Sequence, residues 1–284
     1  MSELSKRVVV AFVAAPLAVV VVYVGGLSLA TLLCVLAGGT AWELFRIARA
    51  GGVDPLDALG IPLAAAIPLV VHADQAGILR IPLSLGAVVV VGVLGASIWL
   101  RGVNGKPLAA VAVTVFGVLY AGMLSFGYAL RYHPYAVGDA AGTTIVAFPL
   151  VLAWATDSGA FVVGRTVGGP KLIPTVSPGK TISGAIGGLV AAVVVAWFYT
   201  HGVLRTRAQL GLSPWGTVLF AVVVSVAAQV GDLAESLLKR EAGVKDSSRL
   251  IPGHGGLLDR LDSLLFVLPV AHLLFSWLLL PARP

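Results

Sequence analysis

The sequence has little charge, because only 11% of its 284 residues are Asp, Glu, Lys or Arg. A soluble domain carries about 25%. Hydrophobic residues make up 58% of the chain, and a water-soluble monomer cannot hide that much apolar surface. The scarcity of charge therefore excludes soluble, disordered and fibrous classes, and it predicts an integral membrane protein.

Cysteine is scarce as well. Cys34 is the only one, so an internal disulfide is impossible and the fold does not depend on an oxidising compartment. The five histidines show no zinc-like spacing, which argues against a zinc site. The net charge of +6 is expected to report membrane orientation and contact with anionic lipid or phosphate, and not nucleic-acid binding.

Long apolar stretches make up most of the sequence. A membrane-spanning helix needs about 20 mostly apolar residues. The sequence predicts an all-α, polytopic integral membrane bundle with about nine transmembrane helices. The predicted spans are 8–24, 27–40, 58–73, 81–100, 108–130, 143–164, 182–200, 210–231 and 263–280. We interpret the first as an uncleaved helix, because no polar cleavage region follows it.

The distribution of Lys and Arg predicts a cytoplasmic N-terminus, because most of these residues then fall on the cytoplasmic side. Arg205 and Arg207 are exceptions in a predicted outer loop. Residues 41–50 fit a short amphipathic interfacial helix, although we favour the alternative that they form the cytoplasmic end of the preceding helix.

The acids gather in two polar stretches, residues 157–184 and 229–262. An acidic stripe that leaves an apolar span is costly in lipid unless it faces a cavity, a metal or a partner charge. The alternative is an interfacial helix end in which an acid and a lysine pair at i, i+4. The polar residues at helical spacing on one predicted face are Gln229, Asp232, Glu235, Ser236 and Lys239.

Two loops have the composition of phosphate sites. Closely spaced glycines around His254 let backbone N–H groups approach phosphate oxygens, and Asp259 and Asp262 nearby suit Mg²⁺. The loop 171–181 offers the Ser177 hydroxyl and the Lys180 ammonium, without the spacing of a P-loop. The alternatives are an ordinary glycine-rich turn and a proline turn at the membrane surface.

Residues 236–262 resemble the signature of the phosphatidate cytidylyltransferases, also called CDP-diacylglycerol synthases. That signature reads Ser-x-apolar-Lys-Arg, four residues, Lys-Asp, then His-Gly-Gly-apolar-x-Asp-Arg-x-Asp. The runs that begin at Asp157 and Ser177 are also similar to the family. One departure is Ser183, which stands where the family often has a glutamate, so an acidic role at this position is in doubt.

The resemblance implies a membrane enzyme that condenses CTP with phosphatidate to CDP-diacylglycerol and pyrophosphate. The lipid phosphate attacks the CTP α-phosphorus with the help of Mg²⁺, and a second cation is left open. The resemblance also implies a homodimer in the inner (plasma) membrane, with its site facing the cytoplasm. Residues 1–142 would form a scaffold with lipid access and dimer contacts, and residues 143–284 the catalytic region.

The resemblance, together with the chemistry of the side chains, assigns candidate residues. The expected metal ligands are Asp232, Asp246, Glu235 and Asp259. The expected catalytic residues are Asp232, Lys239, Arg240, Lys245, Asp246, His254, Asp259 and Arg260. The expected substrate-binding residues are Asp157, Ser177, Lys180, Thr181, Ser236, Gly255, Gly256 and Asp262.

Two other functions stay open at this point. A transporter of a phosphorylated or anionic solute would also place charges in a membrane, although it should show interrupted spans in two related halves. A related CTP-dependent synthase acting on another lipid phosphate is closer in chemistry. A CDP-alcohol phosphotransferase is disfavoured, because its Asp-Gly-x-x-Ala-Arg motif is absent from the sequence.

Overall fold

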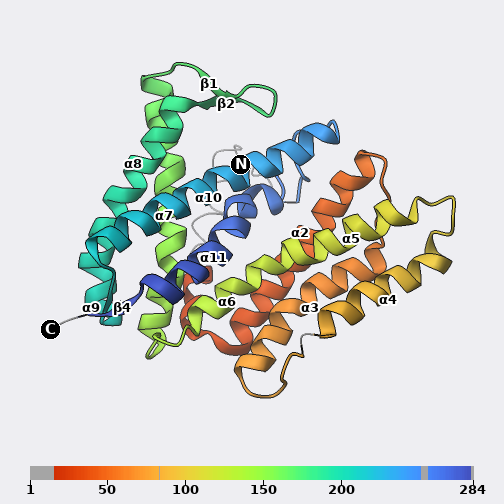
Figure 1. Ribbon diagram of the computed structural model, residues 1–284, viewed down its shortest axis with the longest axis horizontal. Coiled ribbons are helices and arrows are strands. Elements are labelled where there is room, and N and C mark those ends of the chain that lie inside the picture. The colour runs from red at the N-terminus through yellow and green to blue at the C-terminus, as the bar shows by residue number, and fades with distance from the viewer. Residues whose placement is uncertain (1–15, 83, 251–254, 283–284) are drawn as a thin grey trace, which may run out of the picture. The chain divides into compact units, whose positions relative to one another are not determined.

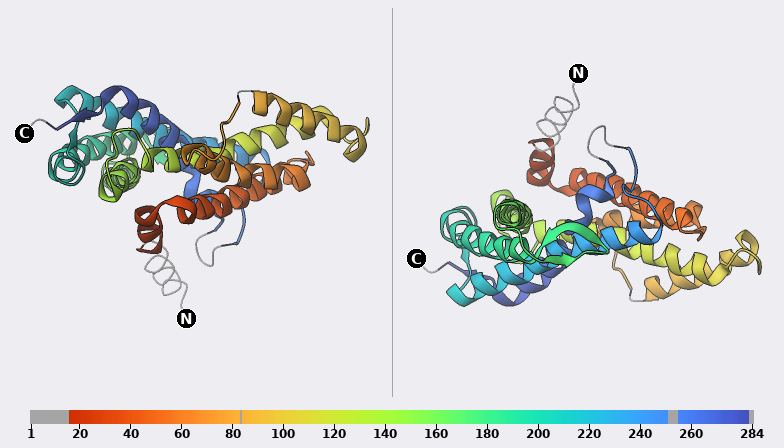
Figure 2. Two further views of the ribbon diagram at one scale, coloured as in Figure 1. Left: turned by 90° about the horizontal axis from the view of Figure 1, so that it is seen from below. Right: turned by 90° about the horizontal axis from the view of Figure 1, so that it is seen from above.

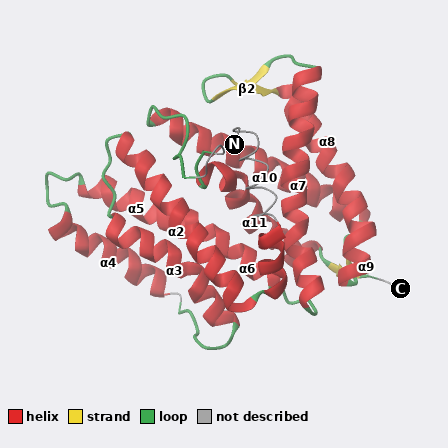
Figure 3. Cartoon of the chain, turned by 180° about the vertical axis from the view of Figure 1, so that it is seen from behind, coloured by secondary structure: helices red, strands yellow, loops and turns green. Residues whose placement is uncertain are grey.

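Figure 1 shows the computed structural model of the chain, which describes residues 16–82, 84–250 and 255–282. Seven helices in this part of the chain are long and apolar enough to cross a membrane. They are Gly26–Ala50, Asp57–Gln75, Pro107–Arg131, Asp139–Thr166, Ile182–Ala208, Pro214–Glu241 and Leu258–Leu278. The predicted all-α, multi-span class is therefore confirmed, and Figure 3 shows strands only as short pieces outside the helices.

Two of the predicted spans need comment. The span predicted at 81–100 is the shorter helix α4 (Ser84–Leu100), which has 17 residues. The span predicted at 8–24 lies mostly outside the described residues, and its described part, 16–24, is helical. Within the described residues, seven long helices and the shorter α4 therefore correspond to eight of the nine predicted spans.

The chain divides into two compact units, and each is described by itself. The first consists of the described residues within 1–128 and 238–261. Its complete helices are α2 (Gly26–Ala50), α3 (Asp57–Gln75), α4 and α5 (Pro107–Gly122), followed by the 3₁₀ turn η1 (Met123–Ser125) and the start of α6 (Phe126–Arg131). It also holds the last turn of α10 (Pro214–Glu241) and the first turn of α11 (Leu258–Leu278).

Small residues let the helices of the first unit approach closely. Helices α2, α3 and α5 pack side by side, as both views of Figure 2 show. The ring of Phe45 is fully buried, and a Cβ on Gly60 or on Gly117 would collide with it. The backbone N–H of Leu56 donates to Thr114 Oγ1 at 2.8 Å. Close packing and satisfied polar groups are what helix association in lipid requires.

The second unit consists of the described residues within 129–237 and 262–284. Its elements, in chain order, are α7 (Asp139–Thr166), β1 (Lys171–Ile173), β2 (Ser177–Thr181), α8 (Ile182–Tyr199), the π-helical turn η2 (Thr200–Leu204), α9 (Arg205–Ala208), β3 (Leu210–Gly211), most of α10 and α11, and β4 (Leu280–Pro281). Stacked rings of Phe148, Phe220 and Phe275 fill its core.

Helices α7 and α8 lie against each other, and glycines set their separation (Figure 1). A Cβ on Gly159 would lie 2.5 Å from Ala191 Cβ and 2.9 Å from the carbonyl oxygen of Gly187. The polar ends of α7 and α8 are joined by β1 and β2. The close approach of the two helices therefore fixes the base of this β-hairpin.

The structure shows the form of two segments that the sequence analysis describes as a loop and as a helix end. The loop 171–181 is an antiparallel hairpin, with Lys171 opposite Thr181 and Ile173 opposite Ser177. Its proline and glycine residues disfavour a regular strand, and the register is accordingly irregular between the two pairs. Residues 41–50 form the end of α2, so the expectation that they end the preceding helix is confirmed and the separate interfacial helix is wrong. That this end faces the cytoplasm stays a prediction.

Candidate functional site

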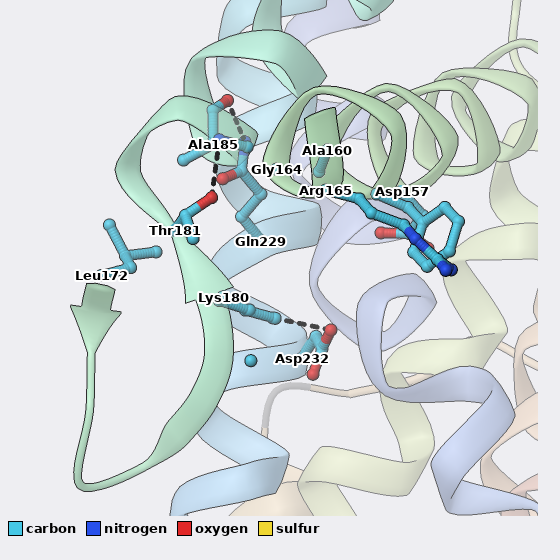
Figure 4. A pocket seen from close by; sticks show the side chains of 13 residues that line it. Asp157, Ala160, Gly164, Arg165, Leu172, Lys180, Thr181, Ala185, Gln229 and Asp232 are labelled. Carbon is cyan, nitrogen blue, oxygen red and sulfur yellow. Dashed lines mark hydrogen bonds and ion pairs between the residues drawn. The ribbon is translucent and has the colours of Figure 1, made fainter. Parts of the chain in front are cut away.

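A cavity of about 550 Å³ opens in the second unit, between α7, the hairpin, α8 and α10. Four charged side chains line it, and we call it the acidic cavity: Asp157 and Arg165 from α7, Lys180 from β2, and Asp232 from α10 (Figure 4). The sequence predicts a role for three of the four. The structure brings these three together although they come from three different elements.

An ion pair crosses the acidic cavity. Lys180 Nζ lies 2.6 Å from Asp232 Oδ2, and the two side chains are 27% and 33% exposed. Ser236, one turn further along α10, donates its hydroxyl to Asp232 Oδ1 at 3.4 Å. Because the pair is only half-buried, each partner keeps access to a ligand in the cavity. Either partner of such a pair can leave the other and bind a charged ligand at a modest cost in free energy.

Two carboxylates, Asp157 and Asp232, face the same cavity. Mg²⁺ is commonly bound by one or two carboxylates together with substrate phosphates and water. The donor set of the cavity, which is made of hard oxygens, therefore fits this ion. Within the described residues no group of three or more His, Cys, Asp or Glu side chains is arranged to hold a metal by itself.

Arg165 belongs to the acidic cavity and is missing from the predicted site residues. It lies in the last turn of α7, with its guanidinium carbon 5.9 Å from the ring centroid of Phe161. Such cation–π contact fixes the side chain while its N–H donors stay available. Its position eight residues after Asp157 in an apolar helix is the signal that could have revealed it.

The hairpin positions its predicted residues in different ways. The Thr181 hydroxyl accepts from Gly184 N at 3.1 Å and so caps the N-terminus of α8. Ser177 begins β2 opposite Ile173 and is not among the residues that line the cavity. Ser183, where an acid is expected, lies 3.1 Å from the Thr181 hydroxyl and donates to the Gly168 carbonyl. The neutral hydroxyl of Ser183 thus has hydrogen-bonding partners at Thr181 and Gly168.

A second group of polar residues lies in the first unit, around the segment that joins α10 to α11. We call it the loop cluster: Glu43, Lys239, Ser247, Gly256 and Asp259. Lys239 Nζ lies 2.7 Å from Asp259 Oδ1, and each side chain is 11% exposed. Asp259 also accepts from Gly256 N at 2.7 Å, and the Ser247 hydroxyl lies 3.0 Å from Asp259 Oδ2. The predicted residues Lys239, Gly256 and Asp259 are therefore in contact.

Glu43 is the residue of the loop cluster that the sequence analysis missed. It is fully buried and accepts hydrogen bonds from Ser247, Ser248, Leu257 and Leu258. The available signal was an acid inside an apolar helix, which is costly in lipid without a partner. Its contacts lie more than 200 positions away in the sequence, so spacing alone could not identify them.

The remaining predicted residues are not among those that define the acidic cavity or the loop cluster. Asp246, Lys245, Arg240 and Arg260 are exposed, and Arg240 donates to the Val244 carbonyl. Glu235 is buried, Gly255 has a positive φ of 81°, and Asp262 Oδ1 accepts from the N–H of Ser263. His254 lies outside the described residues. That all predicted site residues share one pocket stays a prediction.

The fold and these two clusters define a class: a multi-pass helical membrane protein whose charged residues gather in an acidic cavity and in a loop cluster. The sequence profile of the cytidylyltransferase family matches residues 5–278. The chain therefore belongs to the cytidylyltransferase family.

Three relatives carry the name phosphatidate cytidylyltransferase. The protein from Brucella melitensis is 43% identical over 158 residues, which cover 55% of this chain and 54% of the relative. The protein from Bacillus subtilis is 44% identical over 138 residues, 49% of each chain. The protein from Staphylococcus epidermidis is 43% identical over 133 residues, 47% of this chain and 49% of the relative. The match thus spans about half the length of these curated relatives.

Proposed function

We propose that the chain is a phosphatidate cytidylyltransferase, which condenses CTP with phosphatidate to CDP-diacylglycerol and pyrophosphate. An oxygen of the lipid phosphate forms a bond to the α-phosphorus of CTP, and the bond from that phosphorus to the oxygen of the leaving pyrophosphate breaks. Family membership and the name of the relatives support the reaction. The observation that carries the proposal is the acidic cavity, with its exchangeable Lys180–Asp232 pair.

Both reactants are anions, so cations must offset their repulsion before the phosphates can approach. Lys180 can leave Asp232 for a phosphate oxygen, and Arg165 presents a fork of N–H donors that suits phosphate. The predicted residues Lys239, Arg240, Lys245 and Arg260 are proposed to hold further phosphate oxygens. Transfer of this kind depends mostly on positioning and on neutralising charge.

Mg²⁺ is proposed as the cofactor, with Asp232 as its first ligand and Asp246, Asp259 and Glu235 as the further predicted ligands. When bound, the ion would neutralise the developing charge on the transferred phosphate. The pair of carboxylates in the acidic cavity supports this choice, because two hard oxygen donors in one cavity suit the ion. Ser236 would keep Asp232 in place from α10, and Asp157 would supply the second carboxylate from α7.

A location in the cell membrane with the site facing the cytoplasm is also proposed. CTP would enter from the water, and phosphatidate from the adjoining leaflet. The Lys and Arg bias of the predicted loops supports this orientation. The homodimer rests on the resemblance to the family, and the mass of the purified protein in detergent would test it.

The experiment uses the purified full chain in detergent with phosphatidate, MgCl₂ and CTP labelled at either the α- or the γ-phosphate. We expect the α-label in a CDP-lipid and the γ-label only in pyrophosphate, with no product after chelation by EDTA. Lipid phosphates with a prenyl or ether chain, offered in competition, would reveal a related synthase. Failure to form any CDP-lipid with any divalent cation would contradict the proposal and favour a transporter.

A further inference from the structure

Glu43 places a carboxylate in the interior of a membrane-spanning helix. It lies seven residues before the end of α2 and is 0% exposed. Burial of an ionised carboxylate without partners is strongly unfavourable. The fold therefore requires hydrogen-bond donors around this carboxylate, and these donors indicate the role of this part of α2.

Four donors hold the Glu43 carboxylate, two on each oxygen. Oε2 accepts from the Ser247 hydroxyl at 2.8 Å and from Leu258 N at 2.6 Å. Oε1 accepts from the Ser248 hydroxyl at 2.5 Å and from Leu257 N at 2.8 Å. Four donors fill the capacity of an ionised carboxylate. Two of the donors come from residues 247 and 248 and two from residues 257 and 258, so the one side chain fastens these two stretches of chain together.

Ser247 connects Glu43 to the predicted site residues. Its hydroxyl lies 2.8 Å from Glu43 Oε2 and 3.0 Å from Asp259 Oδ2. A hydroxyl has one proton, so it donates to one carboxylate at a time, whereas the Ser247 N–H donates to Asp259 in either case. The position of Ser247, and with it that of Asp259 and its partner Lys239, therefore depends on Glu43.

Gly256 gives independent support for this arrangement. A Cβ at this position would collide with the Ser247 hydroxyl and would lie 2.5 Å from Glu43 Oε2. Only glycine leaves room for both groups while its own N–H reaches Asp259. The second glycine of the His-Gly-Gly sequence is thus explained by the buried carboxylate of α2.

We propose that Glu43 is a positioning residue for nucleotidyl transfer, which fastens Ser247 and Ser248 to the start of α11 and thereby holds Asp259 and Lys239 in their working arrangement. The inference rests on the proposed function for its catalytic consequence. It assigns a role in the reaction to the N-terminal helices, whose sequence carries none of the recognised motifs. Glu43 touches no substrate in this account and acts through Ser247 and the start of α11.

Hydrogen exchange tests the fastening itself, whatever the protein catalyses. Glu43→Gln keeps the size of the side chain but turns one acceptor oxygen into an NH₂ group that faces donors. In the full chain in detergent, we expect the amides of Leu257 and Leu258 to exchange at least about tenfold faster. Thr40→Val is the matched control, because Thr40 is fully buried one turn away on α2 and should leave the exchange unchanged.

Steady-state kinetics tests the positioning role. We expect Glu43→Gln to raise the KM for CTP about tenfold and to lower kcat, because a displaced group at such a centre can cost up to about 10²-fold. A merely structural role would reduce the amount of active enzyme and so lower the apparent kcat alone. Glu43→Asp, which keeps the charge, should recover part of both losses. If Glu43→Gln does not fold, Ser248→Ala replaces it in the test, because it removes one of the four donors to Glu43. We expect it to raise the KM for CTP and to lower kcat by about threefold each.

The outcomes separate the two proposals. Unchanged exchange at Leu257 and Leu258 would overturn the fastening. Faster exchange with an unchanged KM for CTP would overturn the positioning role and leave a structural one. If the wild-type protein forms no CDP-lipid, the proposed function fails and the catalytic part of this inference fails with it, whereas the exchange result still decides the structural part.

Discussion

In the acidic cavity of the second unit the charged side chains are partly exposed, whereas in the loop cluster of the first unit they are nearly enclosed. Lys180 and Asp232 are 27% and 33% exposed, and Lys239 and Asp259 are 11% exposed each. The exposed pair has few internal hydrogen bonds and can turn to a ligand. The enclosed pair is bound to backbone and hydroxyl donors, which favours a fixed geometry. A lysine–aspartate pair is thus open to a ligand in the acidic cavity, and the same kind of pair has a fixed geometry in the loop cluster.

Asp232→Asn should have the largest effect, because it removes a charge from the acidic cavity with little change in volume. We expect turnover to fall by about 10²–10³-fold, as for other groups that stabilise charge in a reaction centre. The melting temperature should change little, since the side chain is a third exposed. CDP-lipid formation and thermal unfolding in detergent would be measured together, and near-normal turnover would show that the cavity is not the reaction centre.

Gly256→Ala should disturb the loop cluster next most strongly. The added methyl group collides with the Ser247 hydroxyl and crowds Glu43, and overpacking typically costs about 1–3 kcal/mol of stability. We expect a lower melting temperature and a loss of roughly tenfold in turnover, since Asp259 loses the geometry of its N–H partner. A variant as stable and active as the wild type would mean that this network is looser than its contacts indicate.

Arg165→Ala should affect substrate binding more than the chemical step. Loss of a guanidinium that contacts phosphate is expected to raise the KM for CTP about tenfold. Arg165→Lys should recover only part of the loss, because a lysine lacks the planar fork of donors. Equal KM values for wild type and Arg165→Ala would remove Arg165 from the binding residues and leave it as a partner of Phe161.

Ser183→Ala should have the smallest effect. The hydroxyl bonds Gly168 and approaches Thr181, so its loss should cost about 0.5–1.5 kcal/mol of stability. Turnover per folded molecule should stay within about twofold of the wild type. A loss of turnover without a loss of stability would show that this position contributes to the reaction even without the acid that the family often has there.

Composition and motif spacing were enough to predict the long helices and three of the four charged side chains of the acidic cavity. Charge is scarce in an apolar chain, so Asp157, Lys180 and Asp232 were identifiable before their contact was known. The sequence did not reveal the hairpin, because proline and glycine in 174–179 mask its strand character. It did not reveal Glu43 either, because hydrogen bonds between α2 and the start of α11 leave no periodic pattern in the sequence.

Binding of Mn²⁺ in place of Mg²⁺, followed by its paramagnetic resonance spectrum, tests the central claim about the acidic cavity most directly. The control is Asp139→Asn, since Asp139 begins α7 about 27 Å along the helix from Asp157. We expect Asp232→Asn to weaken Mn²⁺ binding at least about tenfold, and Asp139→Asn to leave it unchanged. Equal binding by the wild type and Asp232→Asn would contradict the account.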